Sequence, residues 1–106
     1  MTFTANAALM DAIVLSVVNR EGTYGYKITQ EIRAVMDISE STLYPVLRRL
    51  QREQFLEAYD QEFAGRNRRY YQITAKGRAQ LELYLREWES CKSRIDSVFY
   101  GGNSHD

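Results

Sequence analysis

The sequence has 106 residues, of which 44% are hydrophobic and 26% are charged, so we expect one small soluble domain with a single core. It contains one cysteine, which excludes an intrachain disulfide and suits a reducing compartment. No apolar run reaches the ~18 residues of a membrane span. Because residues 1–6 also lack the pattern of a secretory signal, we expect a cytoplasmic protein.

The formal net charge is zero, but the basic side chains are unevenly distributed. Residues 42–56 contain three arginines and one glutamate, and residues 66–78 contain five basic side chains and no acidic one. An acidic stretch, residues 57–65, separates them. Clustering of this kind favours an anionic partner such as nucleic acid, whereas the alternative is a basic loop that is only solvated.

Residues 5–20 are almost all apolar and contain no Gly or Pro, which predicts a helix that is hydrophobic on most of its surface. One small domain can hardly bury every side of it, so part is expected to face a second subunit. Gly22 is the expected left-handed cap. A second helix is predicted over residues 24–36. Its apolar positions recur at helical spacing: Tyr24, Ile28, Ile32 and Val35.

A third helix is predicted from about Ser39 or Ser41 to Gln54, since both serines are good N-caps. Pro45 should lie near the first turn because it has no backbone N–H to donate. This favours a start at Ser41 or Thr42, while a distorted first turn from Ser39 stays open. The expected buried side consists of Leu43, Val46, Leu47 and Leu50.

Residues 55–60 and 69–74 are predicted to be paired strands joined by a loop over residues 63–68, with Gly65 as the turn former and Arg66 at the tip. Three helices followed by a hairpin are typical of a winged helix-turn-helix. We call this hairpin the wing.

Thr74 is the expected N-cap of a last helix that extends to about Tyr100, although Gly77 weakens its first turn. Six residues of this helix have heptad spacing and form the heptad seam: Leu81, Tyr84, Trp88, Cys91, Ile95 and Val98. Together with Leu9 and Ile13 of the first helix, the seam is the expected interface of a homodimer.

The expected fold class is therefore mainly α with a small β-hairpin. Residues 1–78 would form a winged helix-turn-helix, whose N-terminal helix also contributes to the dimer. Residues 79–106 would form the dimerisation helix and a tail. Both regions would belong to one compact domain.

With this order of elements, the sequence resembles the PadR family of bacterial transcription regulators, and the short branch of that family in its single C-terminal helix. The segments that resemble it are Tyr24–Ile28, Ser41–Leu50 and Gly65–Gly77, in this order and spacing. Gln54 departs from the pattern, since the family usually has glycine there. The resemblance implies a homodimer on a roughly palindromic operator, usually acting as a repressor.

The resemblance places the DNA-binding surface on six residues: Ser41, Thr42, Tyr44, Arg48, Arg66 and Arg68. Ser41 and Thr42 suit phosphates or base edges, and Tyr44 suits a phosphate. Arg48 could grip a guanine or a phosphate, and Arg66 could enter the minor groove. Two further residues of the wing are not counted in this surface. Tyr71 is expected to pack in the core, and Arg69 is ambiguous because strand alternation could turn it away.

Trp88, in the middle of the heptad seam, has two interpretations. In the short branch of the family, an aromatic residue at a similar place can line a ligand pocket at the dimer centre, which would make a small aromatic compound the effector. The alternative is a tryptophan that only packs in the dimer core. Redox sensing by Cys91 is not expected, because a seam position gives it neither exposure nor a lowered pKa.

We expect that the protein is not an enzyme and that it binds neither a cofactor nor a metal ion. The one histidine, His105, lies in the tail, so the folded part cannot assemble a Ser/His/Asp or Cys/His arrangement or a pair of histidine ligands. The competing function is a winged-helix module for protein contacts with little affinity for DNA, which the zero net charge supports.

Overall fold

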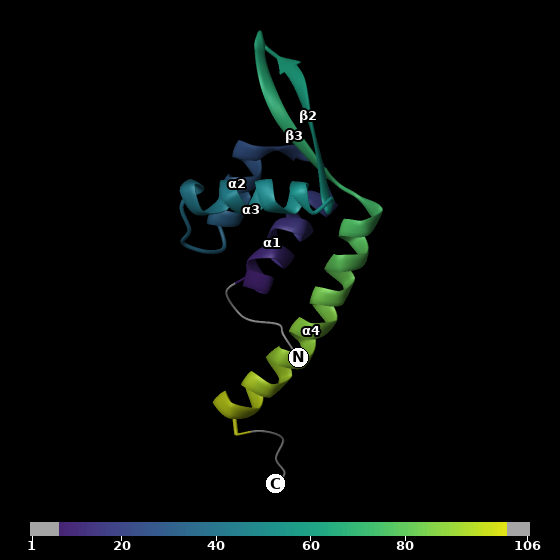
Figure 1. Cartoon of the computed structure of the whole chain (residues 1–106). Coiled ribbons are helices and arrows are strands. Elements are labelled where there is room, and N and C mark those ends of the chain that lie inside the picture. The colour runs from purple at the N-terminus through teal and green to yellow at the C-terminus, as the bar shows by residue number, and fades with distance from the viewer. Residues whose placement is uncertain (1–6, 102–106) are drawn as a thin grey trace.

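The computed structural model describes residues 7–101 and contains four helices and three strands (Figure 1). The elements are α1 (Ala7–Arg20), β1 (Thr23–Tyr24), α2 (Gly25–Arg33), α3 (Glu40–Arg52), β2 (Leu56–Phe63), β3 (Arg66–Ile73) and α4 (Ala75–Phe99). The fold is the expected winged helix-turn-helix with a long C-terminal helix. Residues 5–6, where the first helix was expected to begin, and the tail at 102–106 lie outside the described residues.

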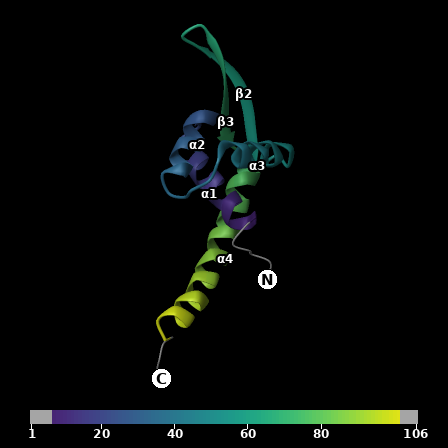
Figure 2. The ribbon, with the colours of Figure 1, turned by 90° about the vertical axis from the view of Figure 1, so that its left-hand side faces the viewer.

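The molecule is elongated, with extents of 63 × 27 × 20 Å. The wing, formed by β2 and β3, rises from one end of the helical body, and α4 leaves toward the other end in both views (Figures 1 and 2). The core therefore lies in the middle, between α1, α2, α3 and the base of the wing. Its fully buried side chains are Val14, Leu15, Val18, Ile28, Thr29, Ile32, Leu43, Leu47, Leu50 and Leu56.

A third strand, β1, extends the predicted hairpin to a sheet in the order β1-β3-β2, with both pairs antiparallel. Thr23 and Tyr24 pair with Tyr71 and Tyr70. The sequence had assigned Tyr24 to the second helix, because its spacing to Ile28 is helical. Pairing with a strand some 47 residues away leaves no local periodicity, so it could not be detected there.

Two expectations for this region were wrong. Gly22 has no left-handed backbone; instead it lies against β3, where an added Cβ would be 3.1 Å from the carbonyl oxygen of Tyr71. Val35 was expected on the buried side of the second helix but is 74% exposed. The cause is that α2 ends at Arg33, so the helical spacing stops before Val35 is reached.

The third helix starts earlier than the start that was favoured. Ser39 is its N-cap and accepts a hydrogen bond at Oγ from the Thr42 N–H (3.3 Å). Its carbonyl also accepts from the backbone N–H groups of Thr42 and Leu43. Pro45 consequently lies inside the helix, in its second turn. The helix tolerates it because the carbonyl of exposed Ser41, which would have accepted from residue 45, can be solvated.

The wing is longer than expected and turns more sharply. Its strands pair in register from Leu56–Ile73 to Phe63–Arg66, which leaves only Ala64 and Gly65 as the loop. Both have positive φ (54° and 79°), as a two-residue type I′ hairpin requires. Gly65 supplies the turn as expected, and Arg66 begins β3 directly beside it.

Thr74 caps α4 as expected, because its Oγ1 accepts from the Gly77 N–H at 2.9 Å. The Thr74 hydroxyl also donates to the carbonyl of Gln54 (2.7 Å), which joins the start of α4 to the end of α3. Gly77 does more than weaken the helix. A Cβ at this position would lie 2.1 Å from the carbonyl oxygen of Phe55 and 2.8 Å from Cγ1 of Ile73.

Gly77→Ala is therefore expected to destabilise the protein by about 3 kcal/mol, the upper range for overpacking against a fixed backbone. Helix propensity alone would give the opposite sign, since alanine is favoured over glycine by about 1 kcal/mol. Urea unfolding of the variant measures the difference. Ala79→Gly, at an exposed position of the same helix, is the control and should lose about 1 kcal/mol. A Gly77→Ala protein as stable as the parent would contradict this close approach.

Gln54, where the PadR pattern has glycine, has a φ of 69°. This left-handed backbone costs a non-glycine residue roughly 1–2 kcal/mol. Gln54→Gly should raise the free energy of unfolding by about 0.5–1 kcal/mol, because the added entropy of glycine in the unfolded chain offsets part of the gain. Gln51→Gly, inside α3, is the matched control and should instead lose about 1 kcal/mol. Equal losses in the two variants would show that Gln54 is unstrained.

Candidate nucleic-acid interface

The N-terminus of α3 presents hydroxyl groups to solvent. Ser41 and Thr42 are exposed, and both hydroxyls lie within hydrogen-bond distance of Ser39 Oγ, at 2.9 and 3.1 Å. Arg48, about two turns further along, is also exposed. A helix N-terminus favours anions, because its free N–H groups and its dipole point outward. This end of α3 can therefore donate hydrogen bonds to phosphate oxygens or base edges.

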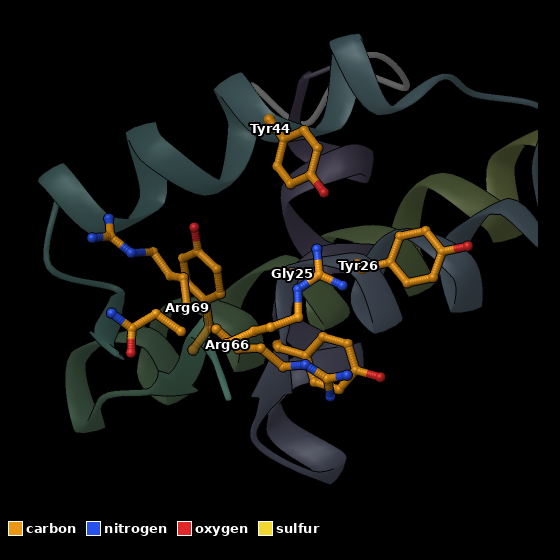
Figure 3. Close-up of a pocket in the computed structure, with 9 residues that line it drawn as sticks. Gly25, Tyr26, Tyr44, Arg66 and Arg69 are labelled. Atoms are coloured by element: carbon orange, nitrogen blue, oxygen red, sulfur yellow. The ribbon is translucent and has the colours of Figure 1, made fainter. Parts of the chain in front are cut away.

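A groove of about 620 Å³ separates α3 from the wing at the N-terminus of α2 (Figure 3). Tyr44 extends into it from α3 and Arg66 from β3 (Figure 3). Gly25 forms part of its wall, and a Cβ there would lie 3.3 Å from the ring of Tyr44. The full lining is Tyr24, Gly25, Tyr26, Tyr44, Arg66, Asn67, Arg68, Arg69 and Tyr71. The structure thus brings the predicted recognition helix and the basic strand of the wing to one surface.

Tyr71 is buried at the base of this groove, as expected, and burial raises the pKa of its hydroxyl. The nearby guanidinium of Arg69 acts in the opposite direction on that pKa. Arg69 itself is ion-paired across the wing, since its Nε lies 3.3 Å from Oδ1 of Asp60. Part of its charge is therefore neutralised within the wing.

The other arginines of the surface differ in what they contact. Within residues 7–101, neither Arg48 nor Arg66 forms an ion pair, and both are exposed. Arg68 is half-buried instead, with its guanidinium carbon 4.3 Å from the ring centres of both Tyr24 and Phe63. Of these three arginines, two therefore have no ion-pair partner among the described residues, and the third is held between aromatic rings.

A buried carboxylate behind α3 was not predicted from the sequence. Asp11 in α1 is 4% exposed and accepts hydrogen bonds from the guanidinium of Arg49 and from the hydroxyl of Tyr84 (3.3 Å). The hydrogen bond to Asp11 raises the pKa of Arg49, and burial raises that of Tyr84. The feature of the sequence that could have indicated this buried carboxylate is the single acidic residue within a mostly apolar helix. Three elements, α1, α3 and α4, meet at this carboxylate.

Comparison with known proteins assigns the chain to a family. The model of the transcriptional regulator PadR-like family matches residues 14–83, which is about two thirds of the chain. The chain belongs to the PadR-like family of transcriptional regulators. This match confirms the resemblance inferred from the residues of α2, α3 and the wing.

Two relatives of known sequence match most of the chain. An uncharacterised protein of Lysinibacillus sphaericus is 37% identical over 97 residues, which is 87% of this chain and 89% of that protein. A transcriptional regulator of Mycobacterium tuberculosis is 36% identical over 83 residues, 77% of this chain and 74% of the regulator. The family that this chain belongs to is one of transcriptional regulators, and the second of these relatives is itself such a regulator.

Solved structures agree with the fold over the same extent. A Streptococcus mutans protein superposes with a TM-score of 0.86 at 38% identity, with both chains covered completely. A PadR-like transcriptional regulator of Bacillus cereus superposes with a TM-score of 0.81 at 26% identity, over 91% of this chain and 96% of that one. The PadR-like fold therefore includes α4 as well as the winged helix.

In this PadR-like chain the heptad seam becomes more exposed toward its end. Leu81 is buried and Ile95 and Val98 are 40% and 78% exposed. The residues between them, Tyr84, Trp88 and Cys91, are half-buried, as are Leu9 and Ile13 on α1. The C-terminal half of α4 thus leaves apolar side chains uncovered within this chain. Among residues 7–101, no helix is both long and apolar enough to cross a membrane.

Proposed function

We propose that this chain is a sequence-specific DNA-binding repressor that acts as a homodimer on an inverted-repeat operator. The observation that supports this most is the groove in which Tyr44 of α3 and Arg66 of the wing meet, beside the unpaired cation of Arg48. A helix fits the major groove, and a basic hairpin can reach the neighbouring minor groove or phosphates. The place of action in this proposal is the cytoplasm, where a bacterial chromosome lies.

The proposed contacts follow from the chemistry of each side chain. The hydroxyls of Ser41 and Thr42 would donate to phosphates or base edges, and Tyr44 would bond a phosphate. Arg48 would form a bidentate pair with guanine or clamp a phosphate. Arg66 would enter the minor groove, and Arg68 would add its charge to the same face of the wing.

The heptad seam supports the homodimer. Residues 1–78 would form the DNA-binding region, and residues 79–106 the dimerisation helix and tail. The uncovered residues at the end of α4 include Val98, Phe99 and Tyr100, each at least 70% exposed. A second copy of α4, together with Leu9 and Ile13 of α1, would cover this surface. Two recognition helices related by a two-fold axis would then read half-sites about one helical turn apart.

Trp88 offers the proposed dimer a place for an effector. Two indole rings facing each other across the two-fold axis could stack on a small planar aromatic compound and release the repressor from DNA. The competing interpretation is that the two rings only pack together. Quenching of the single tryptophan's fluorescence by planar aromatic compounds, at saturable concentrations, distinguishes the two.

Selection of bound duplexes from random DNA at about physiological salt tests the function. We expect an enriched inverted repeat. Arg66→Ala should weaken binding similarly for all sequences and reduce the salt dependence of log Kd by about two units, since each protomer of the dimer loses one cationic contact to the DNA. Arg48→Ala should relax preference at one position of each half-site, by about 1–3 kcal/mol.

Arg86→Ala is the control, because Arg86 is exposed on α4 and distant in the chain from the proposed surface. It should leave both affinity and salt dependence unchanged. Equal losses across all sequences in both test variants would make Arg48 a phosphate contact only. Failure to enrich any duplex, combined with salt-insensitive binding to a protein, would favour the winged-helix protein-interaction module.

Trp88→Ala is expected to weaken the dimer by about 2 kcal/mol, roughly 30-fold in its dissociation constant, as for a tryptophan at the centre of an interface. Sedimentation over a range of concentrations measures this constant. Leu83→Ala is the matched control, since Leu83 is on the same helix, is 41% exposed and lies outside the heptad seam. An unchanged dimer in the Trp88 variant would place the interface elsewhere.

A further inference from the structure

We propose that Arg68 is a positioning residue: it holds the distal wing, and thereby Arg66, at a fixed angle to α3 by stacking between Tyr24 and Phe63. The proposal rests on the proposed function, because it concerns how the wing reaches DNA. It changes the role of Arg68 from a cation that adds its charge to the DNA-binding face of the wing to a residue that acts through the strand carrying Arg66.

The wing needs such support because its distal half lacks a third strand. β1 pairs with β3 only through Tyr24–Tyr70 and Thr23–Tyr71, at the base of the wing. Beyond this point β2 and β3 continue as a two-stranded ribbon as far as the Phe63–Arg66 pair. An isolated two-stranded hairpin is marginally stable in water. Figures 1 and 2 show this part of the wing projecting beyond the helices.

Arg68 links the supported base to the unsupported end. Its guanidinium lies 4.3 Å from the ring centre of Tyr24, which belongs to β1, and 4.3 Å from that of Phe63, at the end of β2. A planar guanidinium can stack on both rings at once. Since Phe63 is the cross-strand partner of Arg66, holding Phe63 also holds the backbone that carries Arg66.

Arg68 and the two rings on either side of it form a clamp, with Tyr24 as its lower ring and Phe63 as its upper ring. Neighbouring aromatic contacts hold the lower ring in place. Tyr24 packs edge-on against Tyr70, with ring centres 5.6 Å apart, and Tyr70 stacks on Tyr59 at the same distance. Tyr24 is therefore anchored to both β3 and β2. Phe63 is 53% exposed, so the upper ring has no core to hold it in place. Arg68 is the contact that joins this ring to the anchored ones.

The first experiment follows backbone amide hydrogen exchange of the wing by NMR, in the free protein. Arg68→Ala and Phe63→Leu should each accelerate exchange of the distal wing amides, residues 60–69, by about fivefold, the size expected for one exposed cation–π contact. Phe63→Tyr keeps the aromatic ring, so its amides should exchange as slowly as those of the parent protein. Arg66→Ala, at an unstacked arginine of the same strand, should leave it unchanged. Unaltered exchange in Arg68→Ala would overturn the clamp.

The second experiment measures Kd for the selected duplex against salt concentration. Phe63→Leu removes no charge, yet it should weaken binding about as much as Arg68→Ala, about fivefold. Neither should change the salt dependence of log Kd, whereas Arg66→Ala should reduce it by about two units, one for each protomer of the dimer. Combining Phe63→Leu with Arg68→Ala should add little further loss, because both break the same stack.

The outcomes separate the clamp from the proposed function. If Arg68→Ala reduces the salt dependence by about two units, one for each protomer, while Phe63→Leu binds normally, Arg68 is a direct phosphate contact and the positioning role is wrong. If no duplex is enriched, the proposed function fails, and the exchange experiment still decides whether the clamp exists.

Discussion

The carboxylate of Asp11 is the constraint on which the placement of the helices depends. It is almost completely buried in α1, and it accepts hydrogen bonds from Arg49 of α3 and from Tyr84 of α4. A buried carboxylate is strongly unfavourable unless it is paired and hydrogen-bonded. Separating α3 from α1 would remove the ion pair and leave the charge without compensation, and separating α4 from α1 would remove the hydrogen bond from Tyr84. The carboxylate thus specifies one arrangement among the many that apolar packing alone would allow.

This constraint also sets which arginine of α3 faces outward. Consecutive residues of a helix lie about 100° apart around its axis. Because Arg49 is turned inward to Asp11, Arg48 is turned to solvent beside the groove. Arg49 forms a second ion pair with Glu53, one turn further along the helix (3.5 Å). Two adjacent arginines that look equivalent in the sequence therefore have different environments, one within the structure and one on its surface.

The zero net charge of the chain does not conflict with a basic surface, because the wing separates its charges by strand. The acidic residues lie on β2 and the arginines on β3. A cross-strand ion pair between Asp60 and Arg69 compensates two of these charges, and Gln72 donates a hydrogen bond to Glu57 (3.1 Å). Arg66, at the end of the wing, lies opposite Phe63 and so has no acidic partner directly across the ribbon. The local field near DNA depends on this arrangement rather than on the total charge.

The sequence by itself determined the order of the helices and the hairpin, most of the core and the helix cap at Thr74, because these depend on local periodicity and local hydrogen bonds. The family could also be recognised from short segments in order. Three features were decided only by the tertiary structure. β1 depends on pairing between Tyr24 and Tyr70, and the requirement for glycine at 77 depends on the carbonyl of Phe55. The different roles of Arg48 and Arg49 depend on Asp11, and the role of Arg68 depends on Tyr24 and Phe63. Apart from the contact of Arg68 with Phe63 in the same hairpin, each of these joins residues far apart in the chain. Neither spacing nor composition encodes which of several chemically suitable partners such a residue meets.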